Sequence, residues 1–233
     1  MSKYRNLFID LDDTLWDTYH NNRQSLEDVF NAHHYDAHYG TFEAFFAVYW
    51  PNNVELWHKY ENGEINKQQL ILNRLAIVLN PMGITSESGI LEINREFLFQ
   101  TTTKKLLIDG AIDLLEYLRP RYRLFILSNG FHEVQMKKLE NSGLAPYFDK
   151  VILSEDAAFN KPQKGIFDYA LRSTNSRKQE SLMIGDAWTS DISGAKNAHI
   201  DQLWFNPKHL QSKDTSSPPT YTVYKLQEIK TIL

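Results

Sequence analysis

Two pairs of aspartates have the spacing of a cation-binding site. Asp10 and Asp12 belong to the segment DLDDT, directly after a short apolar run. Asp186 and Asp191 belong to the segment GDAWTSD, directly after another apolar run. Closely spaced carboxylates repel one another unless a cation joins them, and carboxylate oxygens are ligands that Mg²⁺ accepts. We therefore expect these acids to form one site for a divalent cation; the alternative is acidic helix starts that only complement helix dipoles.

Three further residues are candidates for binding an anion beside that cation. Ser128 and Asn129 follow an apolar run, and a hydroxyl with backbone N–H groups at such a turn can hold a phosphoryl group. The alternative is an ordinary turn. Lys161 precedes Pro162, which we expect to begin a helix, so nearby acids or an anionic ligand must hold this cation against the helix dipole. Metal-binding acids with a cation and a hydroxyl indicate phosphoryl transfer.

The elements that must position these residues alternate along the chain. From residue 108 onwards, short apolar runs typical of buried parallel strands are separated by segments of helical period. This alternation predicts a parallel sheet covered on both faces, which binds its ligands at the carboxyl ends of the strands. The apolar runs are residues 7–9, 124–127, 151–153, 182–184 and 203–205, and the helical segments are residues 111–118, 134–141, 165–171 and 192–198.

The first half of the chain interrupts this alternation. It contains several helical patterns, at residues 23–32, 41–50, 67–79 and 90–99. We therefore predict an α/β fold with a Rossmann-like parallel-sheet core, formed by residues 1–15 and 108–233, and an inserted all-helical cap, formed by residues 16–107. Residues 212–219 are expected to form a solvent loop before a last strand and helix.

The composition excludes several classes of protein. Hydrophobic residues make up 42% of the chain, a share typical of folded proteins and too high for a disordered chain. The formal charge is −4, whereas a dedicated nucleic-acid binder would carry a basic surface. Cysteine is absent, so thiolate metal sites and Cys nucleophiles are excluded. No apolar run approaches the about 18–20 residues of a membrane span. We expect a cytoplasmic monomer or weak dimer that acts on a small phosphorylated metabolite and binds neither nucleic acid polymers nor membranes.

The motif order resembles that of the haloacid dehalogenase superfamily, whose four motifs appear here as DLDDT, Ser128, Lys161 and GDAWTSD. The resemblance covers residues 6–15 and 108–206, and the inserted helices look like the superfamily's type 1 cap. It implies that Asp10 attacks phosphorus to form an aspartyl-phosphate and that Asp12 protonates the leaving oxygen, then activates water. Asp12 is similar to the acid of the phosphatases, which the dehalogenase and phosphonatase branches lack.

The resemblance also implies how the phosphoryl group is bound. Thr14 would support the loop, and Ser128, with Asn129 beside it, would hold a phosphoryl oxygen. Lys161 would offset the negative charge on Asp10 and on the phosphoryl group.

A magnesium site is implied in the same way. Mg²⁺ would be held by the carboxylates of Asp10 and Asp186 and by the backbone carbonyl of Asp12, with Asp191 behind these ligands or bracing the lysine. Two departures from the pattern are Asp13, where many members have Gly, and Ala187-Trp188, which replaces the small hydroxyl residue often found after the first Asp of the GDAWTSD motif.

A closer resemblance, to bacterial pyrimidine 5′-nucleotidases, is carried by the cap segment LWHKYENGEI at residues 56–65. It favours a nucleoside 5′-monophosphate as substrate, and Trp16, two residues after Thr14, is the candidate for stacking on the base. The alternative for such aromatics is a place in a hydrophobic core. Other readings of the whole chain are a phosphatase of sugar or polyol phosphates, and a non-catalytic protein that binds phosphate compounds.

Overall fold

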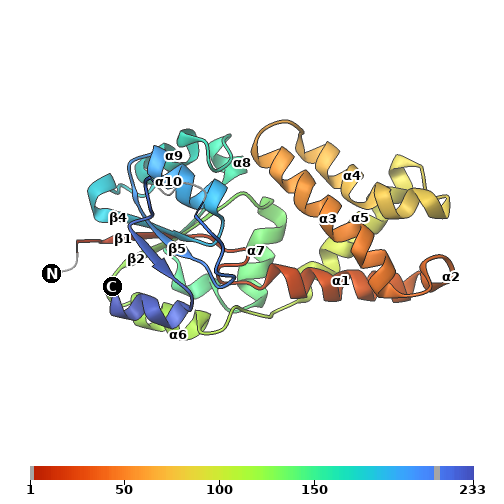
Figure 1. Ribbon diagram of the computed structural model, residues 1–233, viewed down its shortest axis with the longest axis horizontal. Helices are drawn as coiled ribbons and strands as arrows, with labels where there is room; N and C mark the ends of the chain where they lie inside the picture. The colour runs from red at the N-terminus through yellow and green to blue at the C-terminus, as the bar shows by residue number, and fades with distance from the viewer. Residues whose placement is uncertain (1–2, 213–215) are drawn as a thin grey trace. The chain divides into compact units, whose positions relative to one another are not determined.

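A six-stranded, fully parallel sheet carries the predicted motifs. The computed structural model describes residues 3–212 and 216–233 (Figure 1). The strand order is β3-β2-β1-β4-β5-β6, so that the direction of winding reverses between β1 and β4, where open α/β sheets bind ligands. The strands are β1 (Asn6–Ile9), β2 (Arg123–Ser128), β3 (Lys150–Leu153), β4 (Ser181–Gly185), β5 (Asp201–Phe205) and β6 (Tyr221–Val223).

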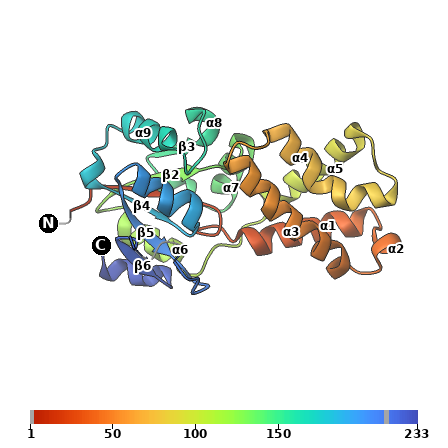
Figure 2. The ribbon, with the colours of Figure 1, turned by 45° about the horizontal axis from the view of Figure 1, so that its top comes forward.

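Strand β1 is buried on both faces because its side chains alternate between two apolar layers. Leu7 and Ile9 join one hydrophobic cluster, and Phe8 joins another on the opposite face. Helices therefore cover both faces of the sheet, as Figures 1 and 2 show. They are α6 (Ala111–Leu118), α7 (His132–Asn141), α8 (Ser154–Ala157), α9 (Lys164–Ser173) and α10 (Ser193–Asn197). The predicted Rossmann-like core is confirmed.

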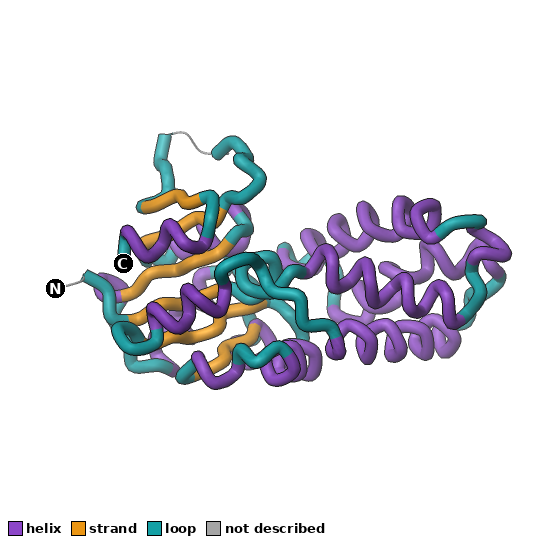
Figure 3. Tube along the Cα trace, turned by 90° about the horizontal axis from the view of Figure 1, so that it is seen from below, coloured by secondary structure: helices purple, strands orange, loops and turns teal. Residues whose placement is uncertain are grey.

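The inserted segment consists of helices joined by loops, drawn in purple and teal in Figure 3, and it contains no strand. Three of its helices begin at polar residues that accept a backbone hydrogen bond in the first turn, namely Thr41, Asn66 and Ser86. Its apolar cluster is rich in aromatic side chains. The helices are α1 (Thr18–Ala32), α2 (Asp36–Tyr39), α3 (Phe42–Glu61), α4 (Lys67–Leu79) and α5 (Glu87–Thr103).

The chain divides into two units, which we call the core unit and the helical unit. The core unit consists of residues 1–18 and 106–233, and the helical unit of residues 19–105. The sequence pattern predicted the boundaries at 15/16 and 107/108. Residues 16–18 belong with the core unit because they bond to it: the Asp17 N–H donates to the Leu106 carbonyl at 3.1 Å, and Trp16 forms a bridge with Leu107.

Several segments differ in detail from the sequence prediction. Helix α9 begins at Lys164, so Pro162, preceded by a cis peptide bond, lies before the helix and not at its first position. The helical segment expected at residues 192–198 opens as a π-helical turn, Trp188–Ile192, and the last helix, Leu226–Thr231, is a 3₁₀-helix. Residues 213–215 of the expected solvent loop lie outside the described residues. Among the described residues, no helix combines the length and apolar character needed to cross a membrane.

Candidate active site

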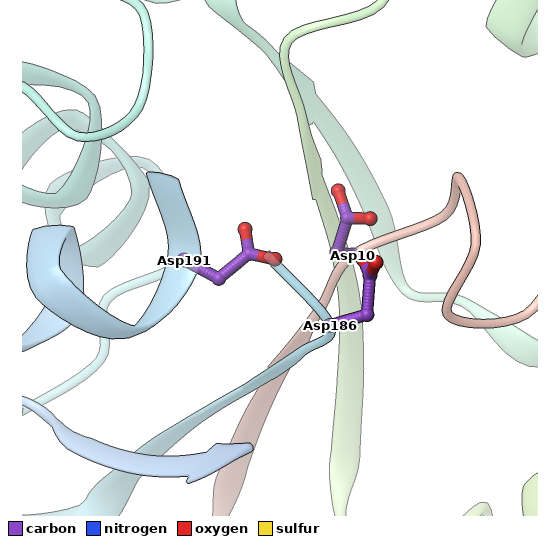
Figure 4. A group of neighbouring side chains, drawn as sticks. All are labelled: Asp10, Asp186 and Asp191. Carbon is purple, nitrogen blue, oxygen red and sulfur yellow. The ribbon is translucent and has the colours of Figure 1, made fainter. Parts of the chain in front are cut away.

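Three buried or half-buried carboxylates meet where β1 and β4 end. Asp10 directly follows β1, Asp186 directly follows β4, and Asp191 lies in the π-helical turn (Figure 4). One oxygen from each carboxylate lies within 4.8 Å of the others. Gly185 permits this approach, because a Cβ atom at that position would lie 2.2 Å from Oδ2 of Asp191. The structure therefore brings together acids from both sequence motifs.

Lys161 lies among these acids and is 2% exposed. Its Nζ donates to Oδ1 of Asp10 at 2.6 Å, to Oδ1 of Asp191 at 2.7 Å and to the Leu127 carbonyl at 2.8 Å. Three acceptors match the three N–H donors of an ammonium group. The sequence prediction that acids hold Lys161 in place agrees with this geometry.

Asn129 fixes the backbone of Lys161. Its Oδ1 accepts from the Lys161 N–H at 2.7 Å, and its Nδ2 donates to the Lys161 carbonyl at 2.9 Å. Both ends of the amide are thereby used to position the lysine. The prediction that Asn129 lies beside a phosphoryl group stays a prediction, and the structure adds that its side chain positions Lys161.

The electrostatics of the cluster show an excess of negative charge. Burial raises the pKa of Asp10 to about 8, against the opposing effect of Lys161. Burial and the neighbouring carboxylates raise the pKa of Asp186 well above its ordinary value. Burial alone would lower the pKa of Lys161, but the charges of Asp10 and Asp191 outweigh it and raise that pKa. One ammonium does not neutralise three acids, so a divalent cation fits the charge of the site.

The hydrogen bonds indicate which oxygens remain for a cation. Both oxygens of Asp191 have donors within normal distance: Lys161 on Oδ1 at 2.7 Å and the Ala187 N–H on Oδ2 at 3.1 Å. Among the described residues, Oδ2 of Asp10 and Oδ1 of Asp186 have only the Thr14 hydroxyl as donor, at 3.5 and 3.4 Å. Asp10 and Asp186 are therefore the better placed ligands, and Asp191 is the better brace for Lys161. The hard oxygen donors suit Mg²⁺.

Thr14 joins the two motif loops. Its hydroxyl accepts from the Asp186 N–H at 3.1 Å while it faces the carboxylates of Asp10 and Asp186. The predicted supporting role of Thr14 is thus a direct link between the ends of β1 and β4.

Asp12 lies apart from these contacts and is held by three donors. Oδ1 accepts from the Thr18 hydroxyl at 2.9 Å and from Lys138 Nζ at 2.6 Å, and Oδ2 accepts from Gln135 Nε2 at 2.6 Å. Burial raises the pKa of Asp12, but the charge of Lys138 and the hydrogen bonds outweigh it and hold that pKa below its ordinary value. Asp13, beside it, has φ 58°, a left-handed conformation in which Gly and Asp are both tolerated.

Ser128 ends β2 and shares a donor with Asp12. Its Oγ accepts from Gln135 Nε2 at 2.7 Å and from the Gly130 N–H at 3.1 Å. The hydroxyl proton of Ser128 can then point to a ligand. Ser128 and Asp12 are thus linked through a single side chain, that of Gln135.

Two tryptophans in or near the sequence motifs, Trp16 and Trp188, pack against other side chains of the core unit. Trp16 has a 0% exposed side chain in the hydrophobic core of the core unit, so the prediction that it stacks on a substrate base is wrong. Its place beside the apolar Leu11 and Leu15 explains the burial, because all three enter the same cluster. Trp188 packs edge-on against Trp204 at 4.8 Å between ring centroids, and Trp204 Nε1 donates to the Asp186 carbonyl at 2.9 Å.

Sequence reasoning missed Gln135, Lys138 and Thr18. Gln135 and Lys138 lie three residues apart on α7 and therefore on one helix face. A polar pair that shares a face with buried Leu139 is a signal of a buried polar contact, since an ordinary solvated pair would lie on the opposite face.

Comparison with known proteins gives consistent matches over most of the chain. The family model of haloacid dehalogenase-like hydrolases matches residues 4–199. The chain is 33% identical to HAD-hydrolase YfnB of Bacillus subtilis, covering 100% of this chain and 97% of YfnB. It is 33% identical to pyrimidine 5′-nucleotidase PynA of Streptococcus pneumoniae, over 97% and 93% of the two chains. It is 34% identical to pyrimidine 5′-nucleotidase YjjG of Escherichia coli, over 81% and 82%.

A solved structure resembles the whole chain. The crystal structure of YfnB bound to magnesium has a TM-score of 0.87 and 31% identity, and covers 100% of this chain and 99% of YfnB. The likeness therefore extends through the core strands and the inserted helices.

Proposed function

The chain belongs to the haloacid dehalogenase-like hydrolases, and from this premise we propose that it hydrolyses nucleoside 5′-monophosphates through an aspartyl-phosphate on Asp10. The observation that carries the proposal is the bridge that Lys161 Nζ forms between Asp10 and Asp191. This bridge fixes one oxygen of Asp10 and places a positive charge where the phosphoryl group would arrive. A binding protein has no need of a carboxylate fixed in this way.

Two steps follow from the residues. An oxygen of Asp10 forms a bond to phosphorus while the bond from phosphorus to the leaving oxygen breaks. Asp12, whose pKa is held low in the substrate-free site, takes up a proton as the negatively charged phosphate group binds beside it and then supplies that proton to the leaving oxygen. Water then attacks the same phosphorus, Asp12 takes its proton, and the bond between phosphorus and Asp10 breaks. Lys161 and the Ser128 hydroxyl hold the phosphoryl oxygens through both steps.

Mg²⁺ is the metal that the site supports. The carboxylates of Asp10 and Asp186 would hold it, with the Asp12 carbonyl as a third protein ligand. When bound, the ion supplies neutralisation of the carboxylates and of the phosphoryl charge. The excess of buried acid over ammonium supports this assignment.

The nucleotide assignment is supported by two relatives named as pyrimidine 5′-nucleotidases, PynA and YjjG, each at least 33% identical to the chain. Both are covered over most of their length. The cytoplasmic location, the state as a monomer or weak dimer, and the lack of nucleic acid and membrane partners stay predictions from the sequence.

Steady-state phosphate release with Mg²⁺ tests the proposal. The panel contains pyrimidine and purine nucleoside monophosphates and sugar and polyol phosphates, with Asp10→Asn as the control. We expect repeated turnover on pyrimidine monophosphates that chelation and Asp10→Asn both abolish. Turnover restricted to sugar or polyol phosphates would keep the reaction and overturn the substrate. Binding of phosphate compounds without turnover on any of them would overturn the reaction itself.

A further inference from the structure

The Asp12 carboxylate is bound from two directions by groups that the reaction scheme does not use. Thr18 reaches it from the segment that leaves the motif loop, and Gln135 and Lys138 reach it from helix α7. All three donors lie 2.6 to 2.9 Å from its oxygens. A carboxylate with donors on both oxygens cannot rotate without breaking a hydrogen bond.

Lys138 is buried and is itself held in place by contacts on two sides. It is 6% exposed, and its Nζ lies 2.6 Å from Oδ1 of Asp12 and 4.0 Å from the centre of the Trp16 ring. A buried ammonium needs charge partners, and here the carboxylate and the aromatic face provide them on two sides. The buried Trp16 ring therefore contacts the Lys138 ammonium in addition to the contact that Asp12 makes with it.

Gln135 links Asp12 to the Ser128 hydroxyl, and its own side-chain oxygen is left without a donor among the described residues. Its Nε2 lies 2.6 Å from Oδ2 of Asp12 and 2.7 Å from Oγ of Ser128. Its Oε1 is buried and has no partner among the residues that the structure describes. A buried acceptor without a donor lowers the stability of the fold, so the amide is not arranged for stability alone. A Cβ atom at residue 130 would lie 2.3 Å from Gln135 Nε2, so Gly130 leaves the room that this bridge requires.

From these contacts we infer that Lys138 and Gln135 are positioning residues of the reaction: they fix the Asp12 carboxylate at a set distance from Ser128. The inference rests on the proposed function, because Asp12 serves as acid and base only in that scheme. Asp12 must reach two different atoms in turn, the leaving oxygen and the attacking water. Both lie on the phosphorus that Ser128 helps to hold, so a rigid link from Asp12 to Ser128 serves both steps.

Lys138→Met tests the inference, because Met keeps the length and the contact with Trp16 but removes the donor. Two substrates are compared: an alkyl phosphomonoester such as a nucleoside monophosphate, and p-nitrophenyl phosphate, whose leaving group needs little protonation. With the alkyl ester we expect kcat to fall at least about tenfold while KM changes less than about twofold. With p-nitrophenyl phosphate we expect a burst of p-nitrophenol followed by slow turnover, because only the second step still needs Asp12.

Matched variants separate positioning from a general structural effect. Lys137→Met, on the exposed side of the same helix, should leave both substrates unchanged. Lys138→Arg should restore most of kcat, since Arg can donate to Asp12 and lie against Trp16. Gln135→Met replaces Lys138→Met if the latter does not fold, and the same burst is expected. Equal losses on both substrates without a burst, or no loss at all, would overturn the inference.

A structural readout keeps the inference separate from the proposed function. In a crystal structure of Lys138→Met we expect the Asp12 carboxylate to leave its wild-type orientation. An unchanged Asp12 in that variant would overturn the positioning role whatever the activity. A wild-type protein without phosphomonoesterase activity would overturn the proposed function, and the orientation of Asp12 would still decide whether Lys138 positions it.

Discussion

The core unit and the helical unit both bury a positively charged side chain, but with different partners. In the core unit, Lys161 contacts two carboxylates and Lys138 contacts one. In the helical unit, Arg74 is 3% exposed, its Nε donates to Oδ1 of Asn94 at 3.1 Å, and its guanidinium lies 5.1 Å from the centre of the Phe97 ring. Within the described part of the chain, Arg74 forms no ion pair.

This contrast separates chemistry from packing. Burial of an ion pair seldom stabilises a protein as much as apolar residues would, whereas loss of one partner leaves an uncompensated charge. The core unit retains several such charges around one point at the end of β1. The helical unit has a single buried cation with a neutral amide and an aromatic ring. The clustered charges of the core unit are therefore better explained by a reaction, and Arg74 by the packing of helices.

The largest expected effect is the loss of activity in Asp10→Asn. Removal of the nucleophile should lower kcat by at least about 10⁴-fold, as for other residues that form covalent intermediates. Folding should be retained, because the pKa of Asp10 is raised to about 8 and Asn resembles the neutral form. Phosphate release with Mg²⁺ measures the loss of kcat, and thermal unfolding in a chelator measures whether folding is retained. Residual activity above one per cent would show that another group attacks phosphorus.

Lys161→Met should have the next largest effect, on stability as well as activity. It leaves Asp10 and Asp191 buried without their ammonium, which costs about 3–5 kcal/mol. The matched control is Lys164→Met, which removes an exposed pair with Asp168 that contributes at most about 1 kcal/mol. Urea unfolding of both variants measures the difference. Equal stabilities would contradict the contrast between the buried cluster and an exposed pair.

The pH dependence of stability should distinguish Asp10 from Asp12. The folded-state pKa of Asp10 is raised to about 8, so in a chelator stability should fall as pH rises from about 4 to about 8, by at most about 1.4 kcal/mol per pH unit. The pKa of Asp12 is lowered, so its contribution is present above about pH 4 and is lost as pH falls below that value. Urea unfolding of wild type and Asp10→Asn between pH 4.5 and 8 isolates the first effect as the difference between the two slopes, because Asp186, whose pKa is also raised, contributes a slope of the same sign to both proteins. Equal slopes in the two proteins would assign the effect to groups other than Asp10.

The smallest effect is expected in the helical unit. The double variant Arg74→Met with Asn94→Leu removes the buried cation and its acceptor together, so the free energy of unfolding should change by less than about 1 kcal/mol or rise. Arg74→Met alone leaves Oδ1 of Asn94 without its donor and should cost about 1–3 kcal/mol. Thermal and urea unfolding compare the two. A double variant less stable than Arg74→Met alone would show that Asn94 stabilises the helical unit through contacts other than the one with Arg74.

The sequence predicted the site best where polar, potentially reactive side chains directly follow a buried strand. Asp10 and Asp186 could be placed together because each follows a buried run, and parallel strands end at one edge of their sheet. Lys161 could be placed with acids because a cation before a helix needs a partner. These inferences needed only local patterns and the geometry of a parallel sheet.

Other residues depend on tertiary packing that local patterns do not encode. Lys138 lies on the same face of α7 as the buried Leu139, but no local pattern shows that this face meets Asp12. Trp16 follows the motif loop, where exposure to a ligand is a natural expectation, but the chain returns it to the core beside Leu15. Pro162 is typical of a helix start, yet the Gln163 N–H bonds to the Asn160 carbonyl in a turn before α9 begins.

The central position of β1 has a consequence for how the protein is made. Residues 6–9 are synthesised well before their sheet partners, which are residues 123–126 and 181–184. Both edges of β1 therefore stay unpaired until residues 123–126 are made, and one edge stays unpaired until residues 181–184 are made, which is the condition under which strands associate wrongly. A chain terminated before β4 carries Asp10 without Asp186 or Asp191, so an incomplete translation product holds the proposed nucleophile but not the complete acidic site.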